Sequence, residues 1–418
     1  MRICLITPEL SPHTLGGIAT YVEALARGYA QRGHKVTVAG YEIHPKPRVE
    51  HDWGESFSLT SRLPVGWMFV NGPMVWRLHH YYPAAKIARG ALAVRKFLKT
   101  WRGEFDIVEL SNWPGHGAFL PRGRWKTVVR LSTPAADCGF PVSSFSTWYE
   151  GRACRFADMV VAHSEAVLQK ATTLYGLESR PSTVVPLGIP DVSISKLGSG
   201  PGHDTLRLVY LGRAEDRKGT DLLIRALAEV MPAHPELRLT VVGGDFDVYA
   251  QSRPEVQGLW STLRATCGGR IELLGKISEE EKVRVLGSSH WLVMPSRYES
   301  FGLVAIEAMR VGTPVIASDA GGLGEVCRQS IGNLSFPSGD AVGLRDALEL
   351  ACEIGPEQVL MRRDATRSVF LERFRDDLMI DRSLSHYEAL LDGSAHAGVF
   401  ATSTVGSMVL GVGPRSLS

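Results

Sequence analysis

The feature that most constrains the fold is an alternation of short apolar runs with amphipathic segments, which occurs twice along the chain. Near the start, the apolar run 3–6 is followed by a Gly-containing loop, the segment GIATYVEALARGYAQRG and a second apolar run at 36–39. Within the middle segment Tyr21, Leu25 and Tyr29 recur at helical spacing, and Gly33 is a natural end for that helix. Strand, helix and strand in this order indicate a parallel sheet with a right-handed crossover.

The first alternation continues through the runs 106–110, 127–131 and 158–162, so we expect one doubly wound domain over residues 1–190. The stretch 187–204, LGIPDVSISKLGSGPGHD, is dense in Gly, Pro and Ser, and residues 191–204 are therefore expected to be an interdomain linker. A second alternation, from LRLVYLGR to TPVIAS, predicts a second α/β domain over residues 205–375. Residues 396–418, uncharged before Arg415, are expected to be a mobile tail without chemistry.

Composition excludes several classes of protein. Hydrophobic residues make up 44% of the 418 residues and charged residues 22%, values ordinary for a globular protein that buries a large core. Lys plus Arg number 46 and Asp plus Glu 44, so the net charge of +2 provides no global field to attract nucleic acid. We therefore expect no nucleic-acid partner, and any effect of charge must be local.

Targeting signals and cysteine spacing favour a cytoplasmic protein. The six cysteines are scattered and form no C-x-x-C pair, which fits a reducing compartment. The opening MRICLIT is too short for the apolar core of a signal peptide, and no uncharged apolar run approaches the roughly 18 residues of a spanning helix.

Two cations follow the first strand of the second domain. After LRLVYL come Gly212, Arg213 and then Lys218, immediately before a helix expected to begin near Thr220. In open parallel sheets ligands bind beyond the carboxyl ends of the strands, and two cations beside helix amides suit a diphosphate. The alternative for such a string is a solvated basic turn.

A second group of polar residues follows the strand HWLVMP. Glu299 falls in the strand-to-helix loop, where a carboxylate can face a substrate, and the amides of Phe301, Gly302 and Leu303 lie at a helix N-terminus that can hold anionic oxygens. Glu307 sits two turns into that helix, on a face that can receive ribose hydroxyls. The alternative is that these carboxylates only complement the helix dipole.

Four features together carry a family resemblance over nearly the whole chain. They are Gly16 with Gly17 in the first loop, Ser164 in VVAHSEAV, Arg213 with Lys218, and the E-x7-E element ESFGLVAIE. With these features in this order, the sequence resembles the retaining glycosyltransferases of family 4. The resemblance implies the GT-B fold, an α/β architecture of two Rossmann-like doubly wound domains that face an interdomain cleft.

The resemblance also assigns roles to residues. It implies that Arg213 and Lys218 bind the donor diphosphate, that Glu299 contacts the transferred sugar and that Glu307 binds the ribose. It further implies that a terminal helix, residues 376–395, crosses back to the first domain. The remaining donor-binding positions that it implies are Gly16, Gly17, Ser300, Phe301, Gly302 and Leu303, with Gly275, Lys276 and Ile277 lining the nucleobase pocket.

One position departs from the family pattern. In many relatives the strand corresponding to TVVRLSTP ends in a His that reaches the donor sugar, whereas the matching residue here is Ser132. A hydroxyl hydrogen-bonds a sugar but cannot act as a readily titrating group. Either the sugar contact differs, or His116, in NWPGHG, supplies the imidazole ring in place of the family's histidine. The alternative for His116 is that it is an ordinary surface histidine. Ser132, His116 and Ser164 are thus the candidate sugar or acceptor contacts.

The resemblance implies a hexosyltransferase that moves a sugar from a nucleotide-sugar donor to a glycan, lipid-linked or small-molecule acceptor. Fixed positive charge around Arg213 and Lys218 suits the nucleoside diphosphate as it leaves an oxocarbenium-like state. In the resembling family, retention is explained by the departing phosphate taking the acceptor proton on the same face. We expect no cofactor and no metal at the reaction centre.

Several rivals remain. The string Asp245-Phe246-Asp247 could ligate a divalent cation in a metal-dependent glycosyltransferase. A nicotinamide oxidoreductase is disfavoured because TPELSPHTLGGIAT lacks G-x-G-x-x-G and GGLGEVC misses its final Gly. A nucleotide-sugar epimerase of the same fold and a non-catalytic sugar-nucleotide-binding relative stay open as alternatives.

A basic segment raises the question of peripheral contact with the inner face of an anionic membrane. Residues 84–103, AAKIARGALAVRKFLKTWRG, place Ile87, Ala91, Val94, Leu98 and Trp101 in a helical stripe, and all their charges are positive. The preceding VGWMFVNGPMVWRLHHYYP is rich in aromatics that suit a lipid interface. The alternative is that the stripe packs on the first domain's sheet and the cations are merely solvated.

Overall fold

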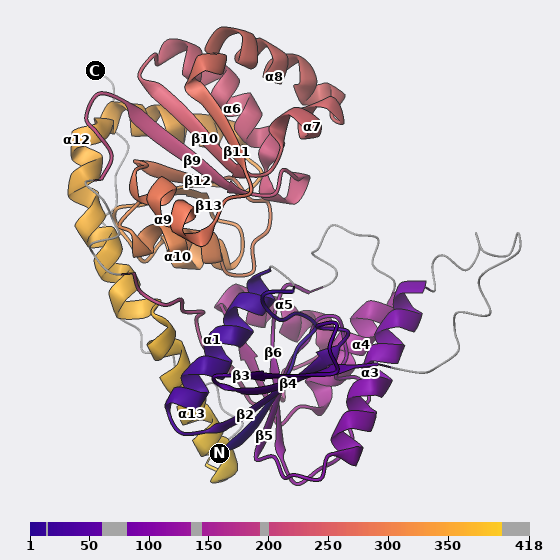
Figure 1. Cartoon of the computed structure of the whole chain (residues 1–418). Helices are drawn as coiled ribbons and strands as arrows, with labels where there is room; N and C mark the ends of the chain where they lie inside the picture. Colours follow the sequence, from indigo (N-terminus) through magenta and orange to yellow (C-terminus); the bar gives the residue numbers. More distant parts are fainter. Residues whose placement is uncertain (14–15, 61–81, 135–143, 193–199, 395–418) are drawn as a thin grey trace, which may run out of the picture.

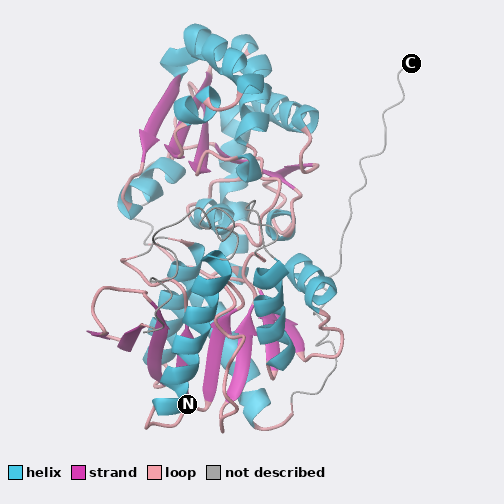
Figure 2. Ribbon diagram, turned by 90° about the vertical axis from the view of Figure 1, so that its right-hand side faces the viewer, coloured by secondary structure: helices cyan, strands magenta, loops and turns pink. Residues whose placement is uncertain are grey.

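The computed structural model describes residues 1–13, 16–60, 82–134, 144–192 and 200–394. Most of the aromatic-rich segment 65–83, linker residues 193–199 and the expected tail 396–418 lie outside the described residues. Figures 1 and 2 show two α/β domains stacked one above the other, each with helices around a central sheet. The expected pair of doubly wound domains is therefore confirmed.

The first domain is built on an eight-stranded sheet in the order β3-β4-β2-β1-β5-β6-β7-β8, with only β3 antiparallel to its neighbour. The strands are β1 (Arg2–Ile6), β2 (Lys35–Tyr41), β3 (Arg48–His51), β4 (Gly54–Leu59), β5 (Ile107–Ser111), β6 (Lys126–Arg130), β7 (Met159–Ala162) and β8 (Ser182–Val184). The helices are α1 (Gly17–Gln31), α3 (Tyr82–Thr100), α4 (Ser144–Phe156) and α5 (Glu165–Tyr175).

Apolar periodicity accounts for how these elements pack. All five residues of β5 and all four of β7 are buried, as expected for central parallel strands covered on both faces. Leu25 and Tyr29 of α1 are fully buried, and so are Ala91 and Val94 at the centre of the α3 stripe. Because α3 packs against β2 and β4, its apolar stripe belongs to the core of the domain, as the alternative interpretation of this segment held.

The second domain has a six-stranded parallel sheet in the order β11-β10-β9-β12-β13-β14, in which successive strands are added to one side of β9 up to β11 and to its other side from β12 on. The strands are β9 (Leu206–Gly212), β10 (Leu237–Gly243), β11 (Ile271–Gly275), β12 (Trp291–Met294), β13 (Val315–Ser318) and β14 (Leu334–Phe336). The helices are α6 (Thr220–Ala233), α7 (Phe246–Gln251), α8 (Pro254–Cys267), α9 (Glu279–Gly287), α10 (Leu303–Arg310) and α11 (Gly322–Cys327), with short 3-10 turns η4 (Asp216–Lys218) and η5 (Gly268–Arg270).

Two C-terminal helices connect the domains. The helical stretch α12 (Ala341–Arg373) is interrupted at Gly355, which precedes Pro356 and has a φ of 68° and a ψ of 168°. Beyond this break, α12 continues toward the first domain (Figure 1). In Figure 1, α13 (Asp376–Leu391) lies beside α1 of the first domain. Its Tyr387 hydroxyl is 3.1 Å from that of Tyr29, and Ile380 occupies the space that a side chain at Gly28 would need. Helix α13 thus packs against the domain in which the chain begins.

Candidate active site

The carboxyl edges of the two sheets face each other. Ser164, which follows β7, donates a hydrogen bond from Oγ to the carbonyl oxygen of Ser300, which follows β12, at 2.9 Å. Gly17, at the start of α1, lies against Leu303 at the start of α10, because a Cβ at Gly17 would be 3.2 Å from Leu303 Cδ1. The structure therefore brings predicted residues of both domains together at the edge where open α/β sheets bind ligands.

A tight turn after β9 carries the predicted cations. Gly219 ends the η4 turn with a φ of 69°, and a Cβ there would lie 1.9 Å from the carbonyl oxygen of Pro295. Only glycine fits this close approach, which joins the β9 and β12 loops. As a result Lys218 Nζ forms an ion pair with the Glu299 carboxylate, and both side chains are largely buried. Two residues that the sequence assigned to different partners, the diphosphate and the sugar, contact each other here.

The cations form a chain of alternating charge. Arg213 has a side chain that is 71% exposed and lies 3.3 Å from Glu215 Oε1. The same Glu215 oxygen accepts a 2.8 Å hydrogen bond from Arg217, whose other terminal nitrogen lies 4.0 Å from Glu299 Oε2. Sequence reasoning missed Arg217, although it precedes Lys218 directly. Three cations and two carboxylates thus line the β9 edge, with one positive charge in excess and Arg213 reaching solvent.

The start of α10 provides amide groups beside this chain. Its N-cap, Gly302, has left-handed backbone geometry with a φ of 103°, and no side chain caps the helix. The first amides of a helix lack intrahelical partners, so those of Gly302 and Leu303 can serve an anion. The Phe301 side chain is buried, with ring centroids 6.4 Å from His163 and 6.0 Å from Phe374. Any donor contact from Phe301 must therefore come from its backbone.

Glu307 is held by a lysine that the sequence did not single out. Lys282 Nζ, on α9, lies 2.8 Å from Glu307 Oε1 and 2.8 Å from Glu279 Oε1. Burial lowers the pKa of Lys282, but Glu307 and Glu279 outweigh burial and leave that pKa raised, so the amine stays charged. The Glu307 carboxylate is thus fixed in place with its second oxygen available for another partner.

The predicted nucleobase residues lie at the end of β11. Gly275 ends the strand with a φ of 64°, Gly275 and Lys276 are exposed, and Ile277 packs partly against the core. They lead directly into α9, which carries Lys282. The expected base contacts therefore lie close along the chain to Lys282, the residue that holds the expected ribose contact Glu307.

The first loop brings an acidic residue to the same edge. Glu9 lies so close to Gly16 that a Cβ at Gly16 would be 2.6 Å from Glu9 Oε2. Glu9 is half-buried, and burial raises the pKa of its carboxyl. Sequence reasoning missed Glu9, since nothing in TPELSPHT distinguishes it from an ordinary loop carboxylate.

Ser164 takes part in an interdomain clamp. Its Oγ accepts from the Val167 amide as the N-cap of α5 and donates to Ser300 of the second domain. The carboxylate of Glu325, on α11, accepts hydrogen bonds from the amides of Glu165 and Ala166 at 2.9 and 2.6 Å. We call these contacts between the α5 N-terminus and Glu325 the α5 clamp. Because Ser164 is only 2% exposed, its hydroxyl is occupied by protein groups.

Ser132 belongs to a polar network inside the first domain. Its amide and hydroxyl both donate to Asn112 Oδ1, at 2.7 and 2.9 Å, and its Oγ lies 3.2 Å from Ser111 Oγ. Ser111 ends β5, Asn112 follows it and Ser132 follows β6, so the network lies at the facing edge of the first sheet. Asn112, which sequence reasoning missed, fixes the position of Ser132.

His116 is not an ordinary surface histidine. It is 7% exposed, with its ring packed edge-on against Tyr41 and its Nε2 against Gly90 of α3. Burial first, and Lys86 second, lower the pKa of His116 to about 4, so the ring is neutral near pH 7. The interpretation of His116 as a surface histidine is wrong because α3 packs over this loop. The sequence of the loop alone does not indicate this packing.

The D-x-D string has structural partners. Asp245 caps α7 by accepting from the Val248 amide at 2.9 Å, and Asp247 accepts from Trp260 Nε1 at 2.6 Å. The two carboxylates thus each serve a different local contact. A depression of about 490 Å³ is lined by Phe57, Phe97 and residues 100–103 of the first domain and includes none of the predicted site residues.

Comparison with known proteins agrees with this arrangement. The model described as Glycosyltransferase Family 4 matches residues 15–192, and the model described as Glycosyl transferases group 1 matches residues 197–367. A glycogen synthase of Mycobacterium tuberculosis (strain CDC 1551 / Oshkosh) is 27% identical over 372 residues, which cover 83% of this chain and 85% of that protein. A D-inositol 3-phosphate glycosyltransferase of Nocardioides sp. is 30% identical over 276 residues, or 60% of each chain.

Solved structures show the same fold. A sucrose-phosphate synthase from Thermosynechococcus elongatus superposes with a TM-score of 0.71 and 19% identity, covering 94% of this chain and all of that one. An Anabaena protein solved in complex with UDP gives a TM-score of 0.64 at 17% identity, with 93% and 100% coverage. The fold is therefore GT-B. Because the two family models together span both domains, the chain belongs to the group 1 and family 4 glycosyltransferases, and it is a hexosyltransferase.

Proposed function

We propose that this enzyme transfers a sugar, with retention of anomeric configuration, from a nucleoside-diphosphate sugar to a glycan, lipid-linked or small-molecule acceptor. The observation that carries the proposal is the chain of cations at the end of β9, where Lys218 and Arg217 meet Glu299 beside the uncapped start of α10. Cations and free amides at one place suit the diphosphate of such a donor.

In this proposal the diphosphate lies between Arg213, Lys218 and the α10 amides. As the bond between the anomeric carbon and the phosphate oxygen breaks, negative charge grows on the phosphate, and fixed positive groups stabilise it. The acceptor hydroxyl attacks the same face of the sugar, and its proton passes to the departing phosphate oxygen. Glu299 accepts hydrogen bonds from the sugar hydroxyls, and Glu307 accepts those of the ribose.

Binding of the diphosphate changes the partners of Glu299. In the free protein Lys218 and Arg217 neutralise this carboxylate. A bound diphosphate competes for the same cations, so the Glu299 oxygens become available to the sugar at the moment the donor binds. In the absence of the donor, the ion pair thereby neutralises the negative charge of the buried Glu299 carboxylate.

The acceptor is proposed to bind on the first domain, at the edge that carries Glu9, Gly16 and the network of Asn112 with Ser132. A half-buried carboxylate and a fixed amide are groups that orient sugar hydroxyls.

Among the described residues, Cys4, Cys154, Cys267, Cys327 and Cys352 are unpaired, which supports a reducing, cytoplasmic location. No helix in the described part of the chain has the length and apolar character needed to span a bilayer.

The test is donor turnover followed product by product. The enzyme is incubated with a panel of nucleoside-diphosphate sugars, with and without mixed glycan and polyprenyl-phosphate acceptors, and free nucleoside diphosphate is measured. We expect its release to depend on an acceptor, and the new linkage to keep the donor's anomeric configuration by NMR. An inverted linkage would contradict retention, and an acceptor-independent change of the sugar would favour an epimerase.

A further inference from the structure

A second cluster of ligand-type side chains lies at the opposite edge of the second sheet. His234 directly follows α6, Glu236 precedes β10, and Cys352 lies on α12, three residues before the break at Gly355. Because β10 begins at Leu237, this cluster lies at the amino edge, whereas the candidate active site lies at the carboxyl edge. It therefore takes no part in sugar transfer.

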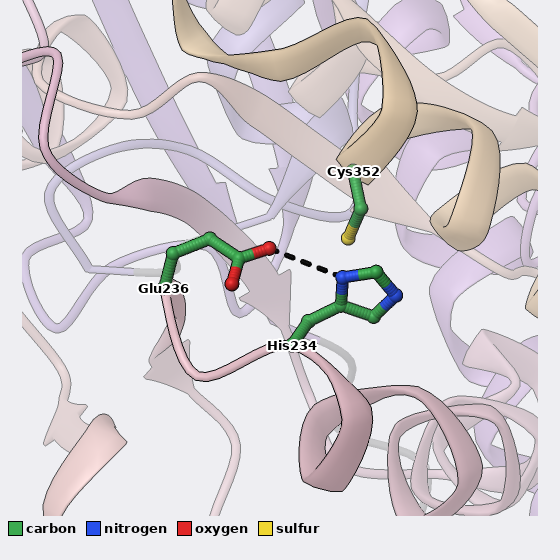
Figure 3. Close-up of side chains that lie close together, drawn as sticks. All are labelled: His234, Glu236 and Cys352. Atoms are coloured by element: carbon green, nitrogen blue, oxygen red, sulfur yellow. Dashed lines mark hydrogen bonds and ion pairs between the residues drawn. The ribbon is translucent and has the colours of Figure 1, made fainter.

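The three side chains point toward one another (Figure 3). A nitrogen of His234, a carboxylate oxygen of Glu236 and Cys352 Sγ all lie within 4.8 Å of one another, and Glu236 Oε1 is 3.1 Å from His234 Nδ1. Tetrahedral Zn²⁺, bound at about 2.0–2.3 Å, holds its ligand atoms roughly 3.3–3.8 Å apart. To reach that spacing, atoms at the widest separation would have to approach each other by about 1 Å.

A fourth residue orients the histidine. Glu349 Oε2 lies 2.7 Å from His234 Nε2, on the side of the ring away from Glu236. In the metal-free protein Nδ1 donates a hydrogen bond to Glu236, and a bound ion would replace the proton on Nδ1 while Nε2 continues to donate its proton to Glu349. A carboxylate that holds the far nitrogen of a ligating histidine is the usual second shell of a zinc site.

The backbone beneath the cluster is fixed. Arg270 donates to the carbonyl oxygens of His234 and Met231 at 2.6 and 2.8 Å, which holds the turn between α6 and β10. The His234 side chain is 24% exposed and that of Glu236 is 40% exposed, so an ion can enter from solvent. The cluster thus combines nitrogen, oxygen and sulfur ligands on a preorganised turn with an open approach.

We propose that His234, Glu236 and Cys352 bind one Zn²⁺ ion, with Glu349 as the orienting second-shell carboxylate and water completing the tetrahedron. The mixture of imidazole, thiolate and carboxylate suits zinc better than the hard ions Mg²⁺ and Ca²⁺, which prefer oxygen ligands. The ion would join α6, β10 and α12 just before the break at Gly355. Its expected effect is on the stability of the second domain.

Cobalt titration of the untagged, metal-free, full-length enzyme tests this proposal. Co²⁺ in a tetrahedral site with a thiolate ligand gives intense visible bands and a near-ultraviolet thiolate-to-cobalt charge-transfer band. We expect both bands to saturate at one equivalent and to disappear when Zn²⁺ is added. Zn²⁺ should also raise the melting temperature of the wild-type protein.

Variants decide whether the named residues are the ligands. Cys352→Ser should abolish the charge-transfer band, and Glu236→Gln should weaken binding at least about tenfold. Glu349→Gln should weaken binding by about 10- to 100-fold, as loss of a second-shell partner does. Glu353→Gln removes an exposed charge next to Cys352 without removing a ligand, so it should bind normally. Absence of saturable binding, a band that persists in Cys352→Ser, or equal losses in Glu353→Gln and Glu236→Gln would overturn the proposal.

Discussion

At the scale of single residues, each carboxylate assigned to the donor is paired with a lysine. Lys218 holds Glu299, and Lys282 holds Glu307. The second pair indicates that Lys282 positions Glu307 for the ribose, even though Lys282 itself is not placed against the donor. This role depends on the proposed function.

Replacement of Lys282 by Met should raise the donor KM about tenfold and change kcat little. A charge-assisted hydrogen bond contributes about 1.5 kcal/mol or more, and a ribose contact acts equally in the ground and transition states. Steady-state kinetics with donor varied at saturating acceptor would measure this. Glu279→Gln, which removes the other, exposed partner of Lys282, should leave KM within about twofold, and Lys282→Arg should restore it partly. A fall in kcat at constant KM would contradict the positioning role.

Sequence alone could locate Lys218 and Glu299, because both follow strands of a parallel sheet and their motif spacing is distinctive. It could not show that they pair, since that contact depends on Gly219 passing against Pro295. Lys282 was missed because it lies in a run of charged residues, SEEEK, that is typical of a solvated helix start. Charge at a site is readable from sequence, but the partner of each charge is set by tertiary packing.

At the scale of elements, the α5 clamp joins a helix of one domain to a carboxylate of the other. Glu325 accepts from two free amides at the positive end of α5, while Ser164 donates across the same interface to Ser300. A carboxylate in this position is stabilised by the helix dipole. The clamp therefore favours the arrangement in which the two sheet edges face each other.

Glu325→Ala should loosen this arrangement. Loss of a helix-capping carboxylate costs about 1 kcal/mol, and because this cap joins the two domains, its loss should weaken the contact between them. Small-angle scattering should show a larger radius of gyration, and transfer should slow while binding of nucleoside diphosphate persists. Asp340→Ala removes an equivalent cap from α12 without touching the interface, so it serves as the control. An unchanged radius together with wild-type transfer would show that the clamp does not set domain closure.

Central elements were predictable and edge elements were not. Buried strands such as β7 and amphipathic helices such as α1 follow directly from apolar runs and helical periodicity. The hairpin β3–β4 and the short edge strand β8 escaped, because RVEH and STV carry no apolar run and are stabilised by pairing along the sheet edge. The first part of helix α12, from Ala341 to the break at Gly355, was likewise not predicted from the sequence.

At the scale of the whole molecule, the proposed chemistry uses side chains and amides where some transferases use a bound cation. Transfer should therefore survive removal of divalent ions by a chelator, within about twofold in kcat. Initial rates with and without EDTA would measure this, followed by addition of Mg²⁺ or Mn²⁺. Loss of activity restored by either ion would require a metal at the diphosphate. Removal of Zn²⁺ from the proposed His234 site should lower thermal stability without lowering this rate.

Membrane contact is the second property of the whole molecule. The apolar stripe of α3 is buried, but Lys86, Lys96, Lys99 and Arg102 are exposed, so any contact would be electrostatic. Each cation near an anionic surface contributes about 1 kcal/mol. Co-sedimentation should show salt-sensitive binding to anionic vesicles only, weakened by charge reversal at Lys96 and Lys99 but not at the exposed Arg382 of α13. Negligible pelleting with anionic vesicles would favour a soluble acceptor.

Binding of nucleoside diphosphates to the wild-type and variant enzymes tests the central claim most directly. Calorimetric titration with ADP, GDP and UDP should show saturable binding of at least one of them to the wild-type protein. Lys218→Ala and Arg213→Ala should each weaken that binding by roughly 10- to 150-fold, since each removes a charge-assisted contact worth about 1.5–3 kcal/mol. Arg284→Ala, which removes an exposed cation of α9, should not. Wild-type affinity in both Lys218→Ala and Arg213→Ala, or no binding of any nucleoside diphosphate to the native enzyme, would contradict a donor site at the end of β9.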